Sequence, residues 1–179
     1  MSPSRLIPAD AGAYRTLMLE AYARHPEAFT SSVAERAALP LAWWEARLAG
    51  AADAAEVVLA VREDGGALGG VVGLSFDGRE KARHKATLFG MYVPDRCRRR
   101  GRGHALLDAA LACAAARPGV RLVQLTVTEG NPAAQALYAR SGFAAFGLEP
   151  MAVAVAGGFV AKVHMWRPLD SGAPPAGGR

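Results

Sequence analysis

Arginine and glycine are concentrated in one short stretch of the chain, RCRRRGRG, at positions 96 to 103. Its five arginines equal the whole formal excess of positive charge, +5. The apolar run from Thr87 to Val93 before it has the composition of a buried strand, and from His104 onward apolar residues recur with helical spacing. A turn between a strand and a helix start gathers free backbone N–H groups, and the helix dipole adds positive charge there. The sequence therefore predicts an anion site of the kind that binds phosphate or pyrophosphate.

Two common phosphate-binding motifs do not fit this stretch. The nucleotide P-loop needs a lysine after its second glycine, and none is present. The dinucleotide fingerprint needs a third glycine where Leu106 stands. The pattern that remains is Arg98-x-x-Gly101-x-Gly103, which resembles the acyl-CoA signature [QR]-x-x-G-x-[GA] of the GNAT N-acetyltransferases.

A second motif follows between Asn131 and Phe143. Asn131 is a good helix cap, Pro132 suits the first helical position, and Gly142 suits the helix end. The run reads N-x-x-A-x-x-L-Y-x-[RK]-x-G-F and is similar to the other signature of the same family. The two motifs occur in the family's order and together span Thr87 to Phe143.

The resemblance implies an α/β chain with the GNAT fold. That fold has a central, mixed, mostly antiparallel sheet of six to seven strands, splayed at its centre and flanked by about four helices. We expect one domain over residues 1–169 and a flexible tail over 170–179, where Gly and Pro are frequent. Apolar periodicity and turn residues predict helices at 11–24 and from 32, 40, 104 and 131, and strands at 4–8, 56–62, 67–76, 85–93, 121–128, 143–155 and 159–167.

The resemblance also implies a reaction: transfer of the acetyl group of acetyl-CoA to an amine of a small molecule or peptide, by direct attack. Strand edge 91–93 would pair with the pantetheine arm and donate an N–H to the thioester oxygen. Tyr138 stands at the family's position for the general acid that protonates the leaving thiolate. The expected cofactor-binding residues are Met91, Tyr92, Val93, Arg98, Arg99, Arg100, Gly101, Arg102, Gly103, His104, Asn131 and Tyr138.

Several of these residues also have purely structural interpretations. Tyr138 has the helical spacing of a packing residue, and Asn131 can act as a cap alone. Cys97 lies in an electropositive loop, but we expect an incidental thiol. No general base is evident, because Thr87 stands where many family members carry a glutamate. Glu35, Glu149, His84 and a water relay are the open alternatives.

Composition limits the remaining function classes. A chain of 179 residues that is 51% hydrophobic fits one folded domain. No apolar run approaches the roughly 18 residues of a membrane helix, and no signal peptide is evident, so we expect a soluble cytoplasmic protein. Cys97 and Cys113 have neither disulfide nor metal-ligand spacing, so no metal is expected.

Two rival functions stay open. One is a non-catalytic acyl-CoA sensor; the other, a nucleic-acid-binding module that uses Arg96–Arg102, is less favoured because no base-stacking aromatic residue accompanies the arginines. The acceptor amine, the use of other acyl groups and the oligomeric state are open as well, and a homodimer is possible.

Overall fold

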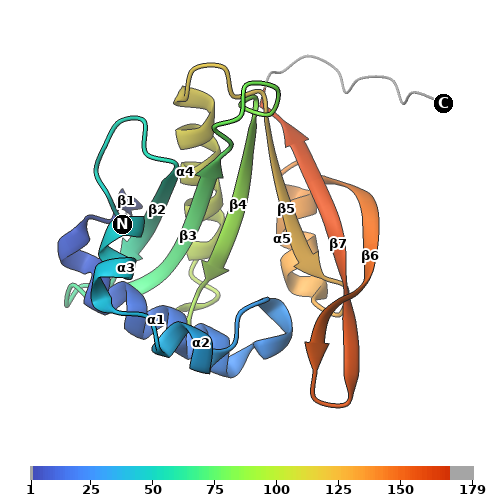
Figure 1. Ribbon diagram of the computed structural model, residues 1–179, viewed down its shortest axis with the longest axis horizontal. Coiled ribbons are helices and arrows are strands. Elements are labelled where there is room, and N and C mark those ends of the chain that lie inside the picture. Colours follow the sequence, from blue (N-terminus) through green and yellow to red (C-terminus); the bar gives the residue numbers. More distant parts are fainter. Residues whose placement is uncertain (1, 170–179) are drawn as a thin grey trace.

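A computed structural model describes residues 2–169, which form a seven-stranded sheet with helices on both faces (Figure 1). The strand order is β1-β2-β3-β4-β5-β7-β6, and every neighbouring pair is antiparallel except β4 and β5. This confirms the predicted fold class, while the expected tail at 170–179 lies outside the described residues. The strands are β1 (Ser4–Arg5), β2 (Glu56–Arg62), β3 (Leu68–Phe76), β4 (Lys85–Tyr92), β5 (Leu122–Thr128), β6 (Ala144–Val155) and β7 (Gly158–Pro168).

Five α-helices and three short 3-10 turns complete the described chain. The helices are α1 (Ala11–Arg24), α2 (Val33–Ala37), α3 (Leu41–Arg47), α4 (Arg102–Ala116) and α5 (Pro132–Arg140). The 3-10 turns are Pro8–Asp10, Pro26–Ala28 and Asp95–Cys97. Among residues 2–169, no helix combines the length and apolar character that a membrane crossing requires.

Alternation along the strands gives the sheet two buried faces. On β2, Val57 and Leu59 belong to one core cluster, whereas Val58 and Ala60 belong to the other. The first cluster includes the apolar face of α4, with Leu106 and Leu107 fully buried. Each such leucine contributes about 1.5–3 kcal/mol on burial. The second cluster joins the opposite face of the sheet to α1 and α3.

The middle of the sheet is open at one end. The parallel pairing of β4 with β5 covers only Lys85 to Thr87, opposite Leu122 to Gln124. The Gln124 Nε2 donates a hydrogen bond to the Thr87 Oγ1 over 3.2 Å, at the last pair. Beyond it the two strands diverge toward their carboxyl ends (Figure 1). The edge of β4 that faces β5 is therefore unpaired near Met91, as the family resemblance implied.

A β-bulge lies in the same part of β4. The register with β3 shifts between Val71 and Gly73, across from Gly90. Gly90 has φ +58°, in the left-handed region that glycine adopts without a Cβ penalty. Because of the bulge, Met91 packs against the core cluster that includes α4. Tyr92 lies in the other cluster, on the opposite face of the sheet.

Two element boundaries differ from the sequence prediction by more than one residue. Helix α4 begins at Arg102, two residues before the expected His104, because Gly101 (φ +71°) turns the chain directly into the helix as its N-cap. The first strand is limited to Ser4–Arg5. Strand β6 is irregular, since its register with β7 shifts between Ala145 and Gly147 and again after Glu149.

Candidate functional site

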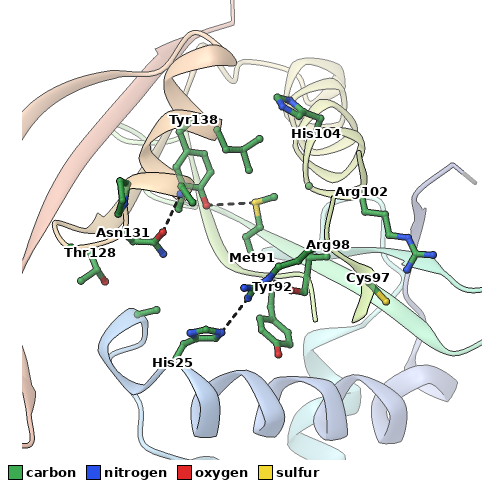
Figure 2. Close-up of a pocket in the computed structure, with 18 of the residues that line it drawn as sticks. His25, Met91, Tyr92, Cys97, Arg98, Arg102, His104, Thr128, Asn131 and Tyr138 are labelled. Atoms are coloured by element: carbon green, nitrogen blue, oxygen red, sulfur yellow. Dashed lines mark hydrogen bonds between the residues drawn. The ribbon is translucent and has the colours of Figure 1, made fainter. Parts of the chain in front are cut away.

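A cavity of about 670 Å³ occupies the open end of the sheet. Three segments supply most of its lining: residues 25–29 after α1, the end of β4 with the arginine–glycine loop, and the end of β5 with α5 (Figure 2). Every expected cofactor-binding residue lines this cavity except Arg100. The two motifs, which are separate in sequence, therefore face each other across one space.

The arginine–glycine loop has the backbone of an anion site. Arg99 and Gly101 both have left-handed φ angles, 60° and 71°. The first hydrogen bond of α4 runs from the Ala105 N to the Gly101 O, 3.0 Å. Among residues 2–169, no backbone acceptor pairs with the N–H groups of Arg102, Gly103 and His104 that precede it. These donors at the positive end of the helix dipole suit a pyrophosphate.

Two arginines of this loop are bound to an acid from another part of the chain. Glu63, at the end of β2, lies 3.5 Å from Arg96 and 3.9 Å from Arg102. Glu20 of α1 is a second partner of Arg96, at 3.4 Å. Arg96 and Arg102 are therefore partly neutralised within the fold, although Arg102 also lines the cavity.

Cys97 lies beneath the same loop and is fully buried. Burial raises the pKa of the Cys97 thiol, and its hydrogen bond to the Glu63 carboxylate raises it further. The thiol is therefore protonated at neutral pH, which agrees with the expected incidental role.

Arg98 is anchored within the site itself. Its Nε donates to the Val93 O over 2.9 Å, and its Nη1 lies 2.7 Å from the Asp95 Oδ1. Its Nη2 is 3.2 Å from the Nε2 of His25, a pocket residue that the sequence analysis missed (Figure 2). Nothing in the motif points to His25, because it comes from the α1 end, far away in sequence.

Two of the five arginines have no such anchor. Arg99 and Arg100 form no ion pair with other residues in the range 2–169, and Arg99 lines the cavity. Arg99 is therefore the guanidinium that is free to meet a ligand phosphate.

Tyr138 projects from α5 toward the open edge of β4 (Figure 2). Tyr138 is 7% exposed, and its Oη lies 3.5 Å from the Met91 Sδ. Burial raises the pKa of Tyr138 to about 12, so the phenol carries its proton at neutral pH. Asn131 caps α5, because its Oδ1 accepts a hydrogen bond from the Ala134 N over 3.0 Å.

The candidate bases lie outside this cavity. The Glu35 carboxylate accepts a hydrogen bond from the Ser32 N over 2.7 Å, as the capping box of α2. Glu149 is held by the His164 ring at 3.0 Å. His84 precedes β4 at the end remote from Met91. In the described part of the chain, no group of three or more His, Cys, Asp or Glu residues is arranged to hold a metal ion.

Comparison with known proteins gives a consistent result. Residues 16–143 match the family model described as the acetyltransferase (GNAT) family. A GNAT-family acetyltransferase from Streptococcus pneumoniae has a similar structure, with TM-score 0.82, 26% identity, and coverage of 93% of this chain and 97% of that one. No curated protein sequence matches the chain.

Two further solved structures share the fold. A putative acetyltransferase from Salmonella typhimurium, solved with its cofactor acetyl-CoA, has TM-score 0.73 and 22% identity over 98% of both chains. A spermidine N-acetyltransferase chimera that includes the Vibrio cholerae enzyme has TM-score 0.71 and 18% identity, over 94% of this chain and 96% of that one.

Proposed function

The chain belongs to the acetyltransferase (GNAT) family, a class of acetyl-CoA-dependent N-acetyltransferases, and we propose that it acetylates the amine of a small molecule or peptide by direct attack on acetyl-CoA. One observation carries this proposal. A single cavity contains a helix start whose first N–H groups have no backbone acceptor, an unpaired strand edge and a buried, protonated phenol. These are the three groups that binding and cleaving this thioester require.

The loop and the strand edge would hold the cosubstrate. The N–H groups of residues 102–104 suit the pyrophosphate, and the Arg99 guanidinium adds charge. The amide-rich pantetheine arm pairs with the free edge of β4, as an added strand would. A β4 N–H near Met91 then stabilises the negative charge that develops on the thioester oxygen.

The chemistry moves one proton from nitrogen to sulfur. The amine nitrogen forms a bond to the acetyl carbon, the carbon–sulfur bond breaks, and CoA leaves as a thiol. Tyr138 donates a proton to the departing sulfur and regains one from the acylated nitrogen through water. The Met91 Sδ, 3.5 Å from the Tyr138 Oη, marks how close to the strand edge this phenol reaches.

Two measurements test the proposal. Calorimetric titration should show binding of acetyl-CoA, and mixing with acetyl-CoA and a panel of amines should release CoA thiol. If acetyl-CoA does not bind, the cavity is not a CoA site. If acetyl-CoA binds but no amine stimulates thiol release, the chain is the non-catalytic sensor instead.

A homodimer and a cytoplasmic location stay predictions. Large apolar side chains on the β6–β7 hairpin are more than half exposed, and they support an interface there: Phe146, Leu148, Met151 and Phe159. Light scattering of the purified protein should give the mass of two chains.

A further inference from the structure

A second cavity, of about 130 Å³, lies on the other side of β4, against α1 and α3. We call it the aromatic–arginine pocket. Its walls include Tyr14, Tyr22, Phe29, Trp44 and Phe89. This volume is close to that of a cavity that holds one benzene ring, about 150 Å³. The pocket therefore has room for one small organic group.

The aromatic–arginine pocket meets the proposed acetyl site at two points. Phe29 lines both cavities, so the two cavities adjoin at this residue. Gly90 lines the aromatic–arginine pocket, and Met91, the next residue, lines the larger cavity. A molecule in the pocket therefore lies beside the part of β4 where the thioester is proposed to sit.

Two guanidinium groups give the pocket its charge. Arg36 and Arg47 both line it, and both lie over the Trp43 ring, at 4.9 and 4.8 Å from the ring centre. Arg47 also forms an ion pair with Glu56, at 3.0 Å.

Arg36 has no comparable partner. Within residues 2–169 its side chain forms neither a hydrogen bond nor an ion pair. The carboxylate next to it in sequence, Glu35, is engaged by the Ser32 N. The Arg36 guanidinium therefore has no ion-pair partner among residues 2–169, although the Glu35 carboxylate acts on it at longer range, and it is a planar group suited to a carboxylate.

We propose that the aromatic–arginine pocket binds the acceptor, and that the acceptor is a small amine that also carries a carboxylate, such as an α-amino acid with an apolar side chain. This inference rests on the proposed acetyltransferase function. The carboxylate pairs with Arg36, the apolar group contacts the aromatic walls, and the amine faces Gly90 and the thioester.

The same charges favour the reactive form of the acceptor. Nearby guanidinium groups disfavour an ammonium ion and lower the pKa of a bound amine. A neutral amine can attack the thioester directly and lose its proton to water afterward. The charges also disfavour polyamines, which have several ammonium groups and no carboxylate.

The experiment compares acceptors that differ only in the carboxylate. CoA release is measured with L-leucine and L-leucinamide, with L-phenylalanine and L-phenylalaninamide, and with spermidine. We expect kcat/KM to be at least tenfold higher for each acid than for its amide, with spermidine the poorest acceptor. In Arg36→Gln the acids should lose at least tenfold in kcat/KM, through KM, while the amides change little. The control is Arg83→Gln, an exposed arginine in the loop before β4, which should behave as wild type.

A measurement of amino-acid binding tests the inference independently of catalytic turnover. Calorimetry with L-leucine and L-phenylalanine, in the presence of CoA, should show at least tenfold weaker binding to Arg36→Gln than to wild type, with CoA affinity and melting temperature retained. If amides or spermidine react as well as the acids, the inference is overturned while the proposed function stands. If acetyl-CoA binds and no amine reacts, the proposed function is wrong. In that case the binding measurement still tests the inference: if Arg36→Gln binds L-leucine and L-phenylalanine as tightly as wild type does, the inference is overturned as well.

Discussion

Replacement of Tyr138 by Phe tests the proposed proton donor with little disturbance of the fold. The ring is buried and packs edge-on against Phe143, with the ring centres 5.9 Å apart. Its hydroxyl has one partner in the range 2–169, the Met91 Sδ at 3.5 Å, and a thioether is a weak acceptor. Loss of that hydroxyl should therefore change the free energy of unfolding by less than about 1 kcal/mol.

The effect on catalysis should be much larger. Removal of a general acid lowers kcat roughly tenfold to a thousandfold, which corresponds to about 1.4–4 kcal/mol of transition-state stabilisation. Acetyl-CoA affinity should stay within about twofold, because the phenyl ring of the variant would fill the same space as the phenol. Since burial raises the pKa of Tyr138 to about 12, ionisation of this phenol should not reduce kcat below about pH 10.

The assay is steady-state CoA release on a verified acceptor, together with calorimetry and a melting curve. A wild-type kcat in Tyr138→Phe would refute the acid role and leave Tyr138 as a packing residue. A large fall in melting temperature would instead show that the hydroxyl is structural, contrary to the weak contact described above.

Three further predictions concern binding and stability. A Cβ on Gly103 would lie 3.5 Å from the Leu137 side chain, so the fold has room for it; Gly103→Val should keep its melting temperature but lose at least tenfold in acetyl-CoA affinity by calorimetry, because its methyl groups enter the phosphate site. Asn131→Ala removes the cap of α5 and should cost about 1 kcal/mol in urea unfolding; an unchanged midpoint would show that the cap is dispensable. Burial raises the pKa of Asp10, but hydrogen bonds from a backbone N–H and from Arg62 outweigh it and leave this pKa below its ordinary value. The folded carboxyl thus binds its proton less readily than the unfolded one, so its stabilising contribution is present above about pH 4 and disappears as the pH falls below that. Arg62→Gln should flatten this acid dependence, and an identical pH profile in the variant would exclude the pair as its source.

The sequence predicted the site best where local chemistry determines structure. Asn131 caps its helix as expected, and the arginine–glycine loop opens a helix at the end of β4. The splay of β4 and β5 was implied by the family resemblance, and it is present after Thr87. Periodicity and turn residues also located the other helices and strands, because those signals act over a few neighbouring residues.

Contacts between distant segments could not be predicted in this way. The acids that neutralise Arg96 and Arg102 come from α1 and from the end of β2. His25 reaches Arg98 from the end of α1. Such contacts depend on how whole helices and strands pack, and no sequence motif indicates them.

The aromatic–arginine pocket is a similar case. Trp44, which is 1% exposed, both joins the core and lines the pocket. Trp43 instead supports the two guanidinium groups. Because Trp43 and Trp44 are adjacent on a short helix, the sequence alone does not show which ring is buried in the core and which contacts the guanidinium groups.

The most direct test of the account follows the acetyl group itself. The protein is incubated with acetyl-CoA that carries a ¹³C-labelled acetyl group and with L-leucine, and the products are analysed by mass spectrometry. We predict labelled N-acetyl-leucine in amounts equal to the CoA thiol released, and none in the absence of protein. Bound acetyl-CoA with no labelled amide from L-leucine or from any other amine of the panel would contradict the assignment of this site to acetyl transfer.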